Sequence, residues 1–215
     1  ADVTLISDFS FGGVSAPNME AGGDYNGDGW DDIALNQGGE IKIIFGKPFS
    51  KTENITEQIG VRLLHVSVSG YAKMKSADID GDGLADLILY GIGTSGSYAD
   101  IVRIYYGRKI WPSTIDVDGV DLSLVGAAYS FPLFGSSIGA GDIDGDGIQD
   151  LLVGNGGASP KGRTNAGEVY LIRGKKARRT GTFNLSTSTE VVTFQGEVAI
   201  NYWGIGVGLG RAVTM

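Results

Sequence analysis

The stretch that decides the fold is DIDGDGIQD at residues 142–150, and the apolar run Leu151-Leu152-Val153 follows it directly. Acidic side chains occupy positions one, three, five and nine of this stretch, and glycine occupies positions four and six. The stretch occurs twice more, as DYNGDGWDD at residues 24–32 and as DIDGDGLAD at residues 78–86. A motif that recurs along the chain in this way indicates an architecture built from repeated structural units.

Short apolar runs follow the other two copies as well, Ile33-Ala34-Leu35 after the first and Leu87-Ile88-Leu89 after the second. Runs of this length predict buried β-strands rather than helices. Small residues precede each copy, a third strand that ends in glycine and a basic residue follows, and a more variable fourth strand completes the unit. Four strands per repeat are typical of one propeller blade. The expected fold is therefore all-β, a β-propeller of four-stranded antiparallel blades, with three complete blades and part of a fourth.

The repeat also predicts how residues 1–215 are divided, as one propeller or a fragment of one. Blades are expected at about residues 11–66, 67–126 and 127–196, with a partial blade at 197–215. The partial blade is expected because WGIGVGLGR at residues 203–211 aligns with FGSSIGAGD at residues 134–142. Arg211 stands where the first acidic residue would be, so that repeat has no metal site. Hairpin loops of variable length are expected at residues 94–98 and 159–165.

The alternating acidic residues suit Ca²⁺, a hard cation that takes six to eight oxygen ligands at about 2.3–2.6 Å. Side-chain oxygens are predicted from positions one, three, five and nine, the last one bidentate, and a backbone carbonyl from position seven. Glycine at position six permits the sharp turn between the ligands. About three ions are expected. The predicted ligands are Asp24, Asn26, Asp28, the Trp30 carbonyl and Asp32; Asp78, Asp80, Asp82, the Leu84 carbonyl and Asp86; and Asp142, Asp144, Asp146, the Ile148 carbonyl and Asp150.

The sequence of these loops is open to two other interpretations. An EF-hand needs Glu at position twelve and flanking helices, whereas position twelve is Leu35, Leu89 and Val153 here. Simple tight turns also use Asp, Asn and Gly, but three copies in one register favour metal binding. Because Asn26 replaces a carboxylate, the first site is expected to bind Ca²⁺ more weakly than the others.

Composition excludes several classes of function. A net charge of −8 and a pI near 4.6 argue against a nucleic-acid-binding surface. With no Cys, the chain has no disulfide and no thiolate site, and its single histidine, His65, is expected to be structural. No apolar run is long enough for membrane insertion. The basic cluster at residues 175–179 is expected to be a solvated turn. No catalytic constellation is present, so the chain is not expected to be an enzyme.

Phe134-Gly135, Gly139-Ala140-Gly141, the acidic loop and Arg173-Gly174-Lys175 together resemble the FG-GAP repeats of the integrin α-subunit β-propeller and its relatives. In the other two repeats only the loops carry the resemblance, since Gly70-Tyr71-Ala72 and residues 15–18 stand where Phe-Gly is expected. The resemblance implies calcium loops on one face that stiffen neighbouring blades, and ligands bound by loops of the other face. The family usually closes with seven blades of about 60 residues.

Several biological settings fit this resemblance. An extracellular or cell-surface module for adhesion or recognition of a protein or carbohydrate is expected first. The alternatives are an ancillary propeller domain of a larger secreted enzyme, phospholipase-like or lyase-like, and an architectural subunit of an extracellular assembly. The chain could be a fragment, which is favoured, a half-propeller completed by another propeller chain or further blades, or a smaller ring.

Overall fold

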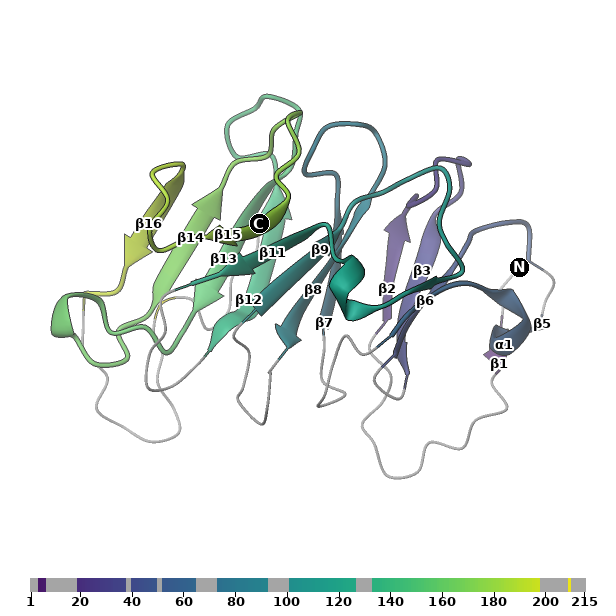
Figure 1. The fold of residues 1–215 in the computed structure, drawn as a ribbon, viewed down its shortest axis with the longest axis horizontal. Coiled ribbons are helices and arrows are strands. Elements are labelled where there is room, and N and C mark those ends of the chain that lie inside the picture. The colour runs from purple at the N-terminus through teal and green to yellow at the C-terminus, as the bar shows by residue number, and fades with distance from the viewer. Residues whose placement is uncertain are drawn as a thin grey trace.

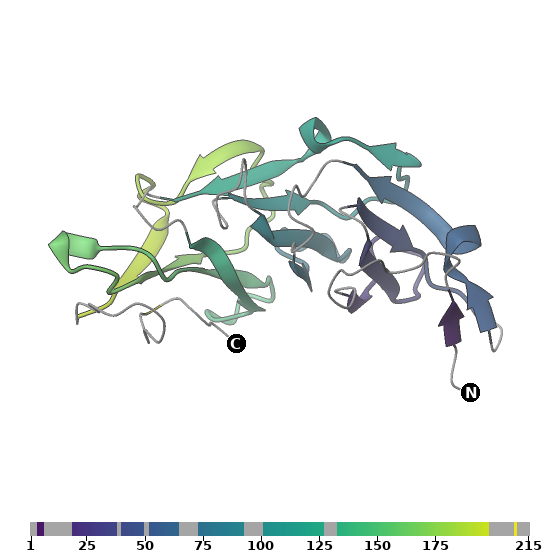
Figure 2. The same ribbon diagram turned by 90° about the horizontal axis from the view of Figure 1, so that it is seen from below.

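The computed structural model describes residues 4–6, 19–37, 40–49, 52–64, 73–92, 101–126, 133–197 and 209. Three twisted β-sheets follow one another in chain order in a row (Figure 1). The view from below shows the same row (Figure 2). Helical structure in the described residues is limited to α1 (Ile55–Gln58) and the 3₁₀ turns η1 (Val117–Gly119) and η2 (Pro160–Gly162). Among these elements no helix is long and apolar enough to cross a membrane.

Each sheet is one blade, and four strands in each blade pair antiparallel in chain order, which confirms the predicted all-β blades. A small separate sheet pairs β1 (Thr4–Ile6) with β5 (Thr52–Asn54). Blade 1 contains β2 (Met19–Gly23), β3 (Asp32–Gln37), β4 (Glu40–Ile44) and β6 (Ile59–Leu63). Blade 2 contains β7 (Lys73–Ala77), β8 (Asp86–Ile92), β9 (Ile101–Tyr105) and β11 (Leu122–Val125). Blade 3 contains β12 (Phe134–Gly141), β13 (Asp150–Asn155), β14 (Glu168–Ile172) and β16 (Val191–Gln195).

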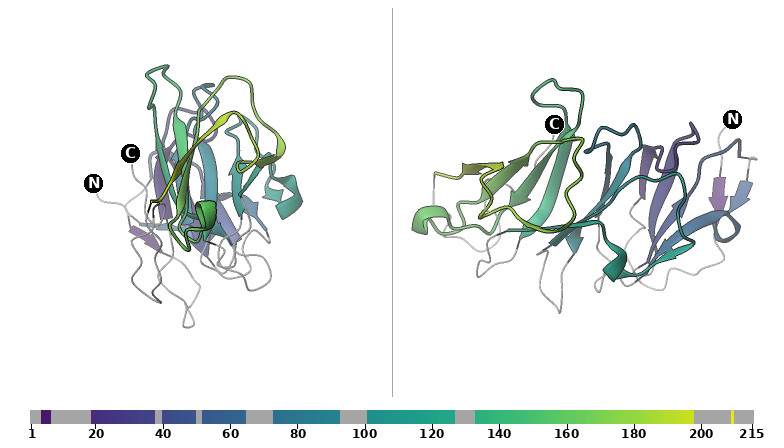
Figure 3. Two further views of the ribbon diagram at one scale, coloured as in Figure 1. Left: turned by 90° about the vertical axis from the view of Figure 1, so that its left-hand side faces the viewer. Right: turned by 45° about the horizontal axis from the view of Figure 1, so that its top comes forward.

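Two of the sheets have a fifth strand that the sequence did not predict. β10 (Thr114–Ile115), which lies between β9 and β11 of blade 2, pairs in parallel with β6 of blade 1. β15 (Gly181–Asn184), which follows β14 of blade 3, pairs in parallel with β11 of blade 2. The chain thus crosses back from blade 2 to blade 1 at β10, and from blade 3 to blade 2 at β15 (Figure 3). These strands are short and their partners lie in another blade, so no local periodicity indicates them.

The strand registers of the three blades match in the middle of the sheets, apart from register shifts between Ile43 and Ile44 and between Leu89 and Ile92. The second and third strands pair Ala34 with Ile43, Ile88 with Ile104 and Leu152 with Leu171. The third and fourth strands pair Ile43 with Val61, Ile104 with Leu122 and Leu171 with Val192. Residues opposite one another across a ladder share a face of the sheet. Equivalent positions in the three blades can therefore be compared directly.

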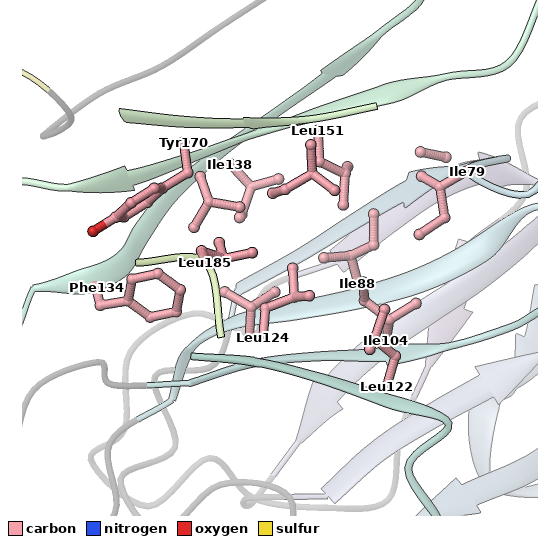
Figure 4. Packing of buried hydrophobic residues seen from close by; sticks show 14 of the residues in the cluster. Ile79, Ile88, Ile104, Leu122, Leu124, Phe134, Ile138, Leu151, Tyr170 and Leu185 are labelled. Carbon is pink, nitrogen blue, oxygen red and sulfur yellow. The ribbon is translucent and has the colours of Figure 1, made fainter. Parts of the chain in front are cut away.

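Two apolar layers fill the spaces between neighbouring blades. The layer between blades 2 and 3 includes Ile79, Ile104 and Leu124 from blade 2, and Leu151 and Tyr170 from blade 3 (Figure 4). The layer between blades 1 and 2 is built in the same way; its members include Tyr25, Ile41, Ile43, Val61, Leu63, Leu87, Leu89 and Tyr105. Burial of these side chains between two sheets, rather than within one, holds the row together.

Some predicted features fall on residues that the structure does not describe. His65, the hairpin loop at 94–98 and most of the partial blade at 197–215 lie outside the described residues. Leu209 is described, and its N–H donates to the Ala166 carbonyl at 3.1 Å. The loop predicted at 159–165 is confirmed as a connection between β13 and β14, and it contains η2.

Candidate metal centres

The three predicted metal loops, named loop 1 (24–32), loop 2 (78–86) and loop 3 (142–150), have one backbone conformation. Their first aspartates accept backbone N–H groups from positions four, five and six. In loop 3 the carboxylate of Asp142 accepts from Gly145 at 2.8 Å, Asp146 at 3.1 Å and Gly147 at 2.9 Å. Asp24 and Asp78 accept the equivalent bonds in loops 1 and 2. The glycine at position six has a φ of 86° or 87° in every loop, as the predicted turn requires.

The ninth residue of each loop is buried, and both of its carboxylate oxygens accept backbone N–H groups. Asp86 accepts one bond from Ile79 and one from Gly107, each at 2.9 Å. Asp32 and Asp150 accept the equivalent pairs. Burial raises the pKa of Asp32 to about 6 and that of Asp86 to about 7, and the backbone donors oppose this shift only in part. Each oxygen keeps a second lone pair, so metal ligation by this residue stays a prediction.

A glycine from the end of the third strand supports each closing aspartate. Gly46, Gly107 and Gly174 donate to Asp32, Asp86 and Asp150, respectively. A Cβ added to them would lie 2.3, 2.6 and 2.4 Å from the carbonyl oxygen of position eight of the loop. Only glycine can approach this closely. The glycine before a basic residue was visible in the sequence, but its role depends on a contact between strands.

The structure brings carboxylates together in two of the three loops. Single oxygens of Asp78, Asp80 and Asp86 lie within 4.8 Å of one another in loop 2, and so do those of Asp142, Asp144 and Asp146 in loop 3. No further group of three acidic side chains this close occurs in the described part of the chain.

Loop 1 differs because Asn26 stands at its third position. The amide nitrogen of Asn26 donates to Oδ2 of Asp28 at 2.9 Å, so a hydrogen-bond donor faces the fifth-position carboxylate where the other loops have a second acid. Weaker calcium binding at loop 1 than at the other two loops stays a prediction.

Position seven, predicted to offer its carbonyl, uses its side chain to cover the preceding loop. A Cβ added to Gly27 of loop 1 would lie 2.8 Å from Leu84, and one added to Gly81 of loop 2 would lie 2.9 Å from Ile148. Trp30, the equivalent residue of loop 1, is exposed. Position seven therefore packs against the previous repeat.

Each of the first two loops is also a joint to the next blade. The carbonyl of Asp24 accepts from Ala85 N–H at 2.9 Å, and that of Asp78 accepts from Gln149 N–H at 3.1 Å. The next carbonyl along does the same: Tyr25 accepts from Arg108 N–H at 3.0 Å and Ile79 from Lys175 N–H at 3.1 Å. The loops thus link blades, a role that the resemblance implied but that the sequence could not locate.

The side chain at position two completes this joint. Tyr25 is fully buried against blade 2, and its hydroxyl lies 2.5 Å from Oγ of Ser76. Burial raises its pKa above the ordinary value for tyrosine. Ile79 is buried against blade 3, whereas Ile143 of loop 3 is exposed.

The basic cluster at residues 175–179 is exposed at Lys176, Ala177 and Arg178, as predicted for a solvated turn, but its two arginines also form ion pairs. Arg178 forms ion pairs with Asp80 and Asp82 of loop 2, although it lies in blade 3. Burial raises the pKa of Asp80, and the guanidinium of Arg178 opposes that shift. In loop 3 the corresponding contact is weaker, because the Arg173 side chain, 3.2 Å from Asp144, is mostly exposed.

Comparison with known proteins places these repeats in a family. Residues 134–172 match the model of the FG-GAP repeat, and residues 24–89 match that of the FG-GAP-like repeat. The two matches contain all three loops.

Similar proteins include integrins and phospholipases. Integrin alpha-PS2 of Drosophila melanogaster is 30% identical over 172 residues, which are 71% of this chain and 11% of that protein. Phosphatidylinositol-glycan-specific phospholipase D is 27% identical over 136 residues in Dictyostelium discoideum, and 32% identical over 112 residues in Bos taurus. Those matches cover 57% and 48% of this chain and 14% and 13% of the two phospholipases, so the chain spans a small part of its relatives. The chain therefore belongs to the FG-GAP, integrin α-like family and is built from propeller-type blades.

Proposed function

We propose that the chain is a calcium-stabilised propeller module, extracellular or at the cell surface, that presents a surface for a protein or carbohydrate partner. The observation that supports calcium is that loop 2, which gathers three carboxylates, also accepts backbone hydrogen bonds from blade 3. Without a cation, each joint concentrates like charges that repel one another. A bound cation would remove that repulsion at the place where two blades meet.

The donor set favours Ca²⁺ among the common metals. Every predicted ligand is an oxygen, from carboxylates, one amide and backbone carbonyls, and the described loops offer neither imidazole nor thiolate. Oxygen-only sites suit Ca²⁺, Mg²⁺ or Mn²⁺ rather than Zn²⁺ or Cu²⁺. The role proposed for the ion is to hold neighbouring blades, not to take part in a reaction.

Thermal unfolding followed by circular dichroism tests this proposal. Excess calcium is expected to raise the melting temperature above that in EDTA, because a ligand that binds only the folded state stabilises it. Asp142→Asn should reduce the calcium-dependent shift, whereas Asp118→Asn, which alters an exposed acid outside the loops, should not. A melting temperature that is equal with calcium and with EDTA would overturn the proposal.

We also propose that the side of blade 3 that the described residues leave partly exposed takes a further blade of the same type. Val192 and Phe194 are 44% and 48% exposed, whereas the register-equivalent Val61, Leu63 and Leu124 are fully buried and Leu122 is 2% exposed. Ile143 is 51% exposed, against 0% for Tyr25 and 8% for Ile79. In blades 1 and 2 these positions are covered by the next blade, which is the occupant that the matching register predicts here.

The chemistry required of this occupant is specific. It must offer an apolar sheet face to Val192 and Phe194, and two backbone N–H groups to the carbonyls of Asp142 and Ile143, as blades 2 and 3 do for loops 1 and 2.

Sedimentation of the chain over a range of concentrations tests this proposal. Association that Phe194→Lys abolishes, and that Ile110→Lys at another exposed site leaves unchanged, supports it. A chain that stays monomeric at all concentrations would contradict an unpaired docking face.

A second candidate function is that of an ancillary propeller within a larger secreted enzyme. The similarity to two phospholipases D favours it. No reaction is proposed for the blades themselves. The complete coding sequence distinguishes the candidates: a neighbouring hydrolase or lyase domain would favour the second over a stand-alone adhesion module or an architectural subunit.

A further inference from the structure

Loop 2 contains a cation that belongs to the protein itself. Arg178 lies between β14 and β15, and its guanidinium pairs with Oδ2 of Asp80 and with Oδ2 of Asp82. The side chain of Asp80 is only 2% exposed. A buried carboxylate without a partner destabilises a fold strongly, so Arg178 is its counter-ion.

The oxygens that Arg178 contacts are those that the loop backbone leaves free. Oδ1 of Asp80 accepts the N–H of Asp82 at 3.2 Å, and Oδ1 of Asp82 accepts the N–H of Leu84 at 2.8 Å. Oδ2 of each residue accepts no hydrogen bond from the described loop backbone, so both of its lone pairs are open to a cation. The guanidinium occupies both of these oxygens.

Blade 2 holds Arg178 in this position from several sides. Its guanidinium carbon lies 4.8 Å from the centre of the Tyr106 ring, and Nη2 donates to the Gly107 carbonyl at 3.3 Å. Tyr106 also donates its hydroxyl proton to the carbonyl of Arg179 at 2.9 Å, which fixes the segment that carries Arg178. These contacts orient the guanidinium toward loop 2, although the Arg178 side chain is 39% exposed.

We infer that Arg178 is an intramolecular counter-cation that competes with calcium for loop 2. The inference rests on the proposed calcium binding. Arginine stays charged at all relevant pH values, so a calcium ion that uses Asp80 and Asp82 meets a fixed positive charge on the same oxygens. Loop 2 therefore joins blades 2 and 3 without metal and fills with calcium after loop 3.

Site-resolved calcium titration by NMR of the whole chain tests the competition. The backbone amides of Gly83 and Gly147 report on loops 2 and 3 separately. Arg178→Gln should lower the calcium dissociation constant of loop 2 by about tenfold or more, since loss of one opposing charge acts directly on the ion, and leave loop 3 unchanged. Lys176→Gln, an exposed charge in the same segment, is the matched control and should change neither constant.

Melting temperatures separate competition from a purely structural role. In EDTA, Arg178→Gln should melt lower than the wild type because Asp80 loses its partner. With saturating calcium the difference should shrink or reverse, and Arg178→Lys, which keeps the charge, should retain a loop 2 affinity close to that of the wild type. If Arg178→Gln lowers stability equally with and without calcium and leaves the loop 2 affinity unchanged, the competition is refuted while calcium binding stands. If neither glycine amide responds to calcium in any variant, the calcium proposal itself fails.

Discussion

Loops 2 and 3 have nearly the same sequence, and their first and ninth aspartates accept the same backbone N–H groups, yet loop 2 is covered by the next blade whereas loop 3 is exposed. Loop 2 has the next blade against it, so Ile79 is buried, its carbonyls accept hydrogen bonds and Arg178 balances its charge. Loop 3 leaves Ile143 and three of its acids exposed. The difference lies in the neighbour and not in the repeat. Each blade therefore supplies half of a core, as expected for repeats stabilised mainly by nearest-neighbour interfaces.

The largest expected effect comes from truncating the second residue of loop 2, Ile79, in comparison with the second residue of loop 3, Ile143. Ile79→Ala should lower the free energy of unfolding by about 2–4 kcal/mol, because it leaves a cavity between blades 2 and 3. Ile143→Ala should change it by no more than about 0.5 kcal/mol, because that side chain is already in water. Urea unfolding of the two variants measures the contrast. Equal losses would mean that Ile143 is buried in solution.

The stability of the folded chain, with and without calcium, should depend on pH. The raised pKa values of Asp32 and Asp86, about 6 and about 7, exceed the ordinary value of about 3.9. The metal-free folded chain therefore binds more protons than the unfolded chain between those values, and its stability should fall as the pH rises from about 4 to about 7.

Under the proposed calcium binding the ion would take the deprotonated loops, so its stabilising effect should grow over the same range. Melting curves in calcium and in EDTA should accordingly lie further apart at pH 8 than at pH 5. A separation that does not depend on pH would show that these two aspartates do not titrate with the metal.

Two buried tyrosines in the joint between blades 1 and 2 allow a finer test. The hydroxyl of Tyr25 has Ser76 as its partner, whereas the hydroxyl of Tyr105 has no hydrogen-bond partner among the described residues. Tyr25→Phe should therefore cost about 1 kcal/mol of unfolding free energy, and Tyr105→Phe should be neutral or stabilising. A double-mutant cycle of Tyr25→Phe with Ser76→Ala checks that the loss belongs to this pair. Additive losses would assign it to some other contact.

The smallest expected effect concerns loop 1. Asn26→Asp restores the acid found at this position in the other two loops, so it should tighten calcium binding at loop 1 a few-fold. Calorimetric titration before and after the substitution measures the change. Weaker binding in the variant would mean that the amide of Asn26 is needed in its present orientation.

Sequence alone predicted those parts of the molecule that depend on local chemistry. The alternation of acids with glycine in residues 142–150 predicts both the turn and a hard-cation site, and the apolar runs after the loops predict strands. Contacts between blades were not predictable in this way. Arg178 and Asp80 are 98 residues apart, and the two-residue strand β10 has its partner in another blade. The glycine that follows each third strand is visible in the sequence. Its hydrogen bond to the ninth-position aspartate of the loop is a contact between strands, so the sequence does not predict it.

The strands that cross between blades give the row a mechanical property. Because β15 leaves blade 3 and pairs with all four residues of β11, blade 2 cannot be pulled away as a rigid body while that ladder holds. A tensile load along the row is carried by backbone hydrogen bonds in addition to side-chain packing. After a protease cut between β14 and β15, the C-terminal piece would still pair with blade 2 through β15 and with blade 3 through β16. A cut in that one segment would not separate blade 3 from blade 2 while the ladder between β11 and β15 and the apolar layer between the two blades persist.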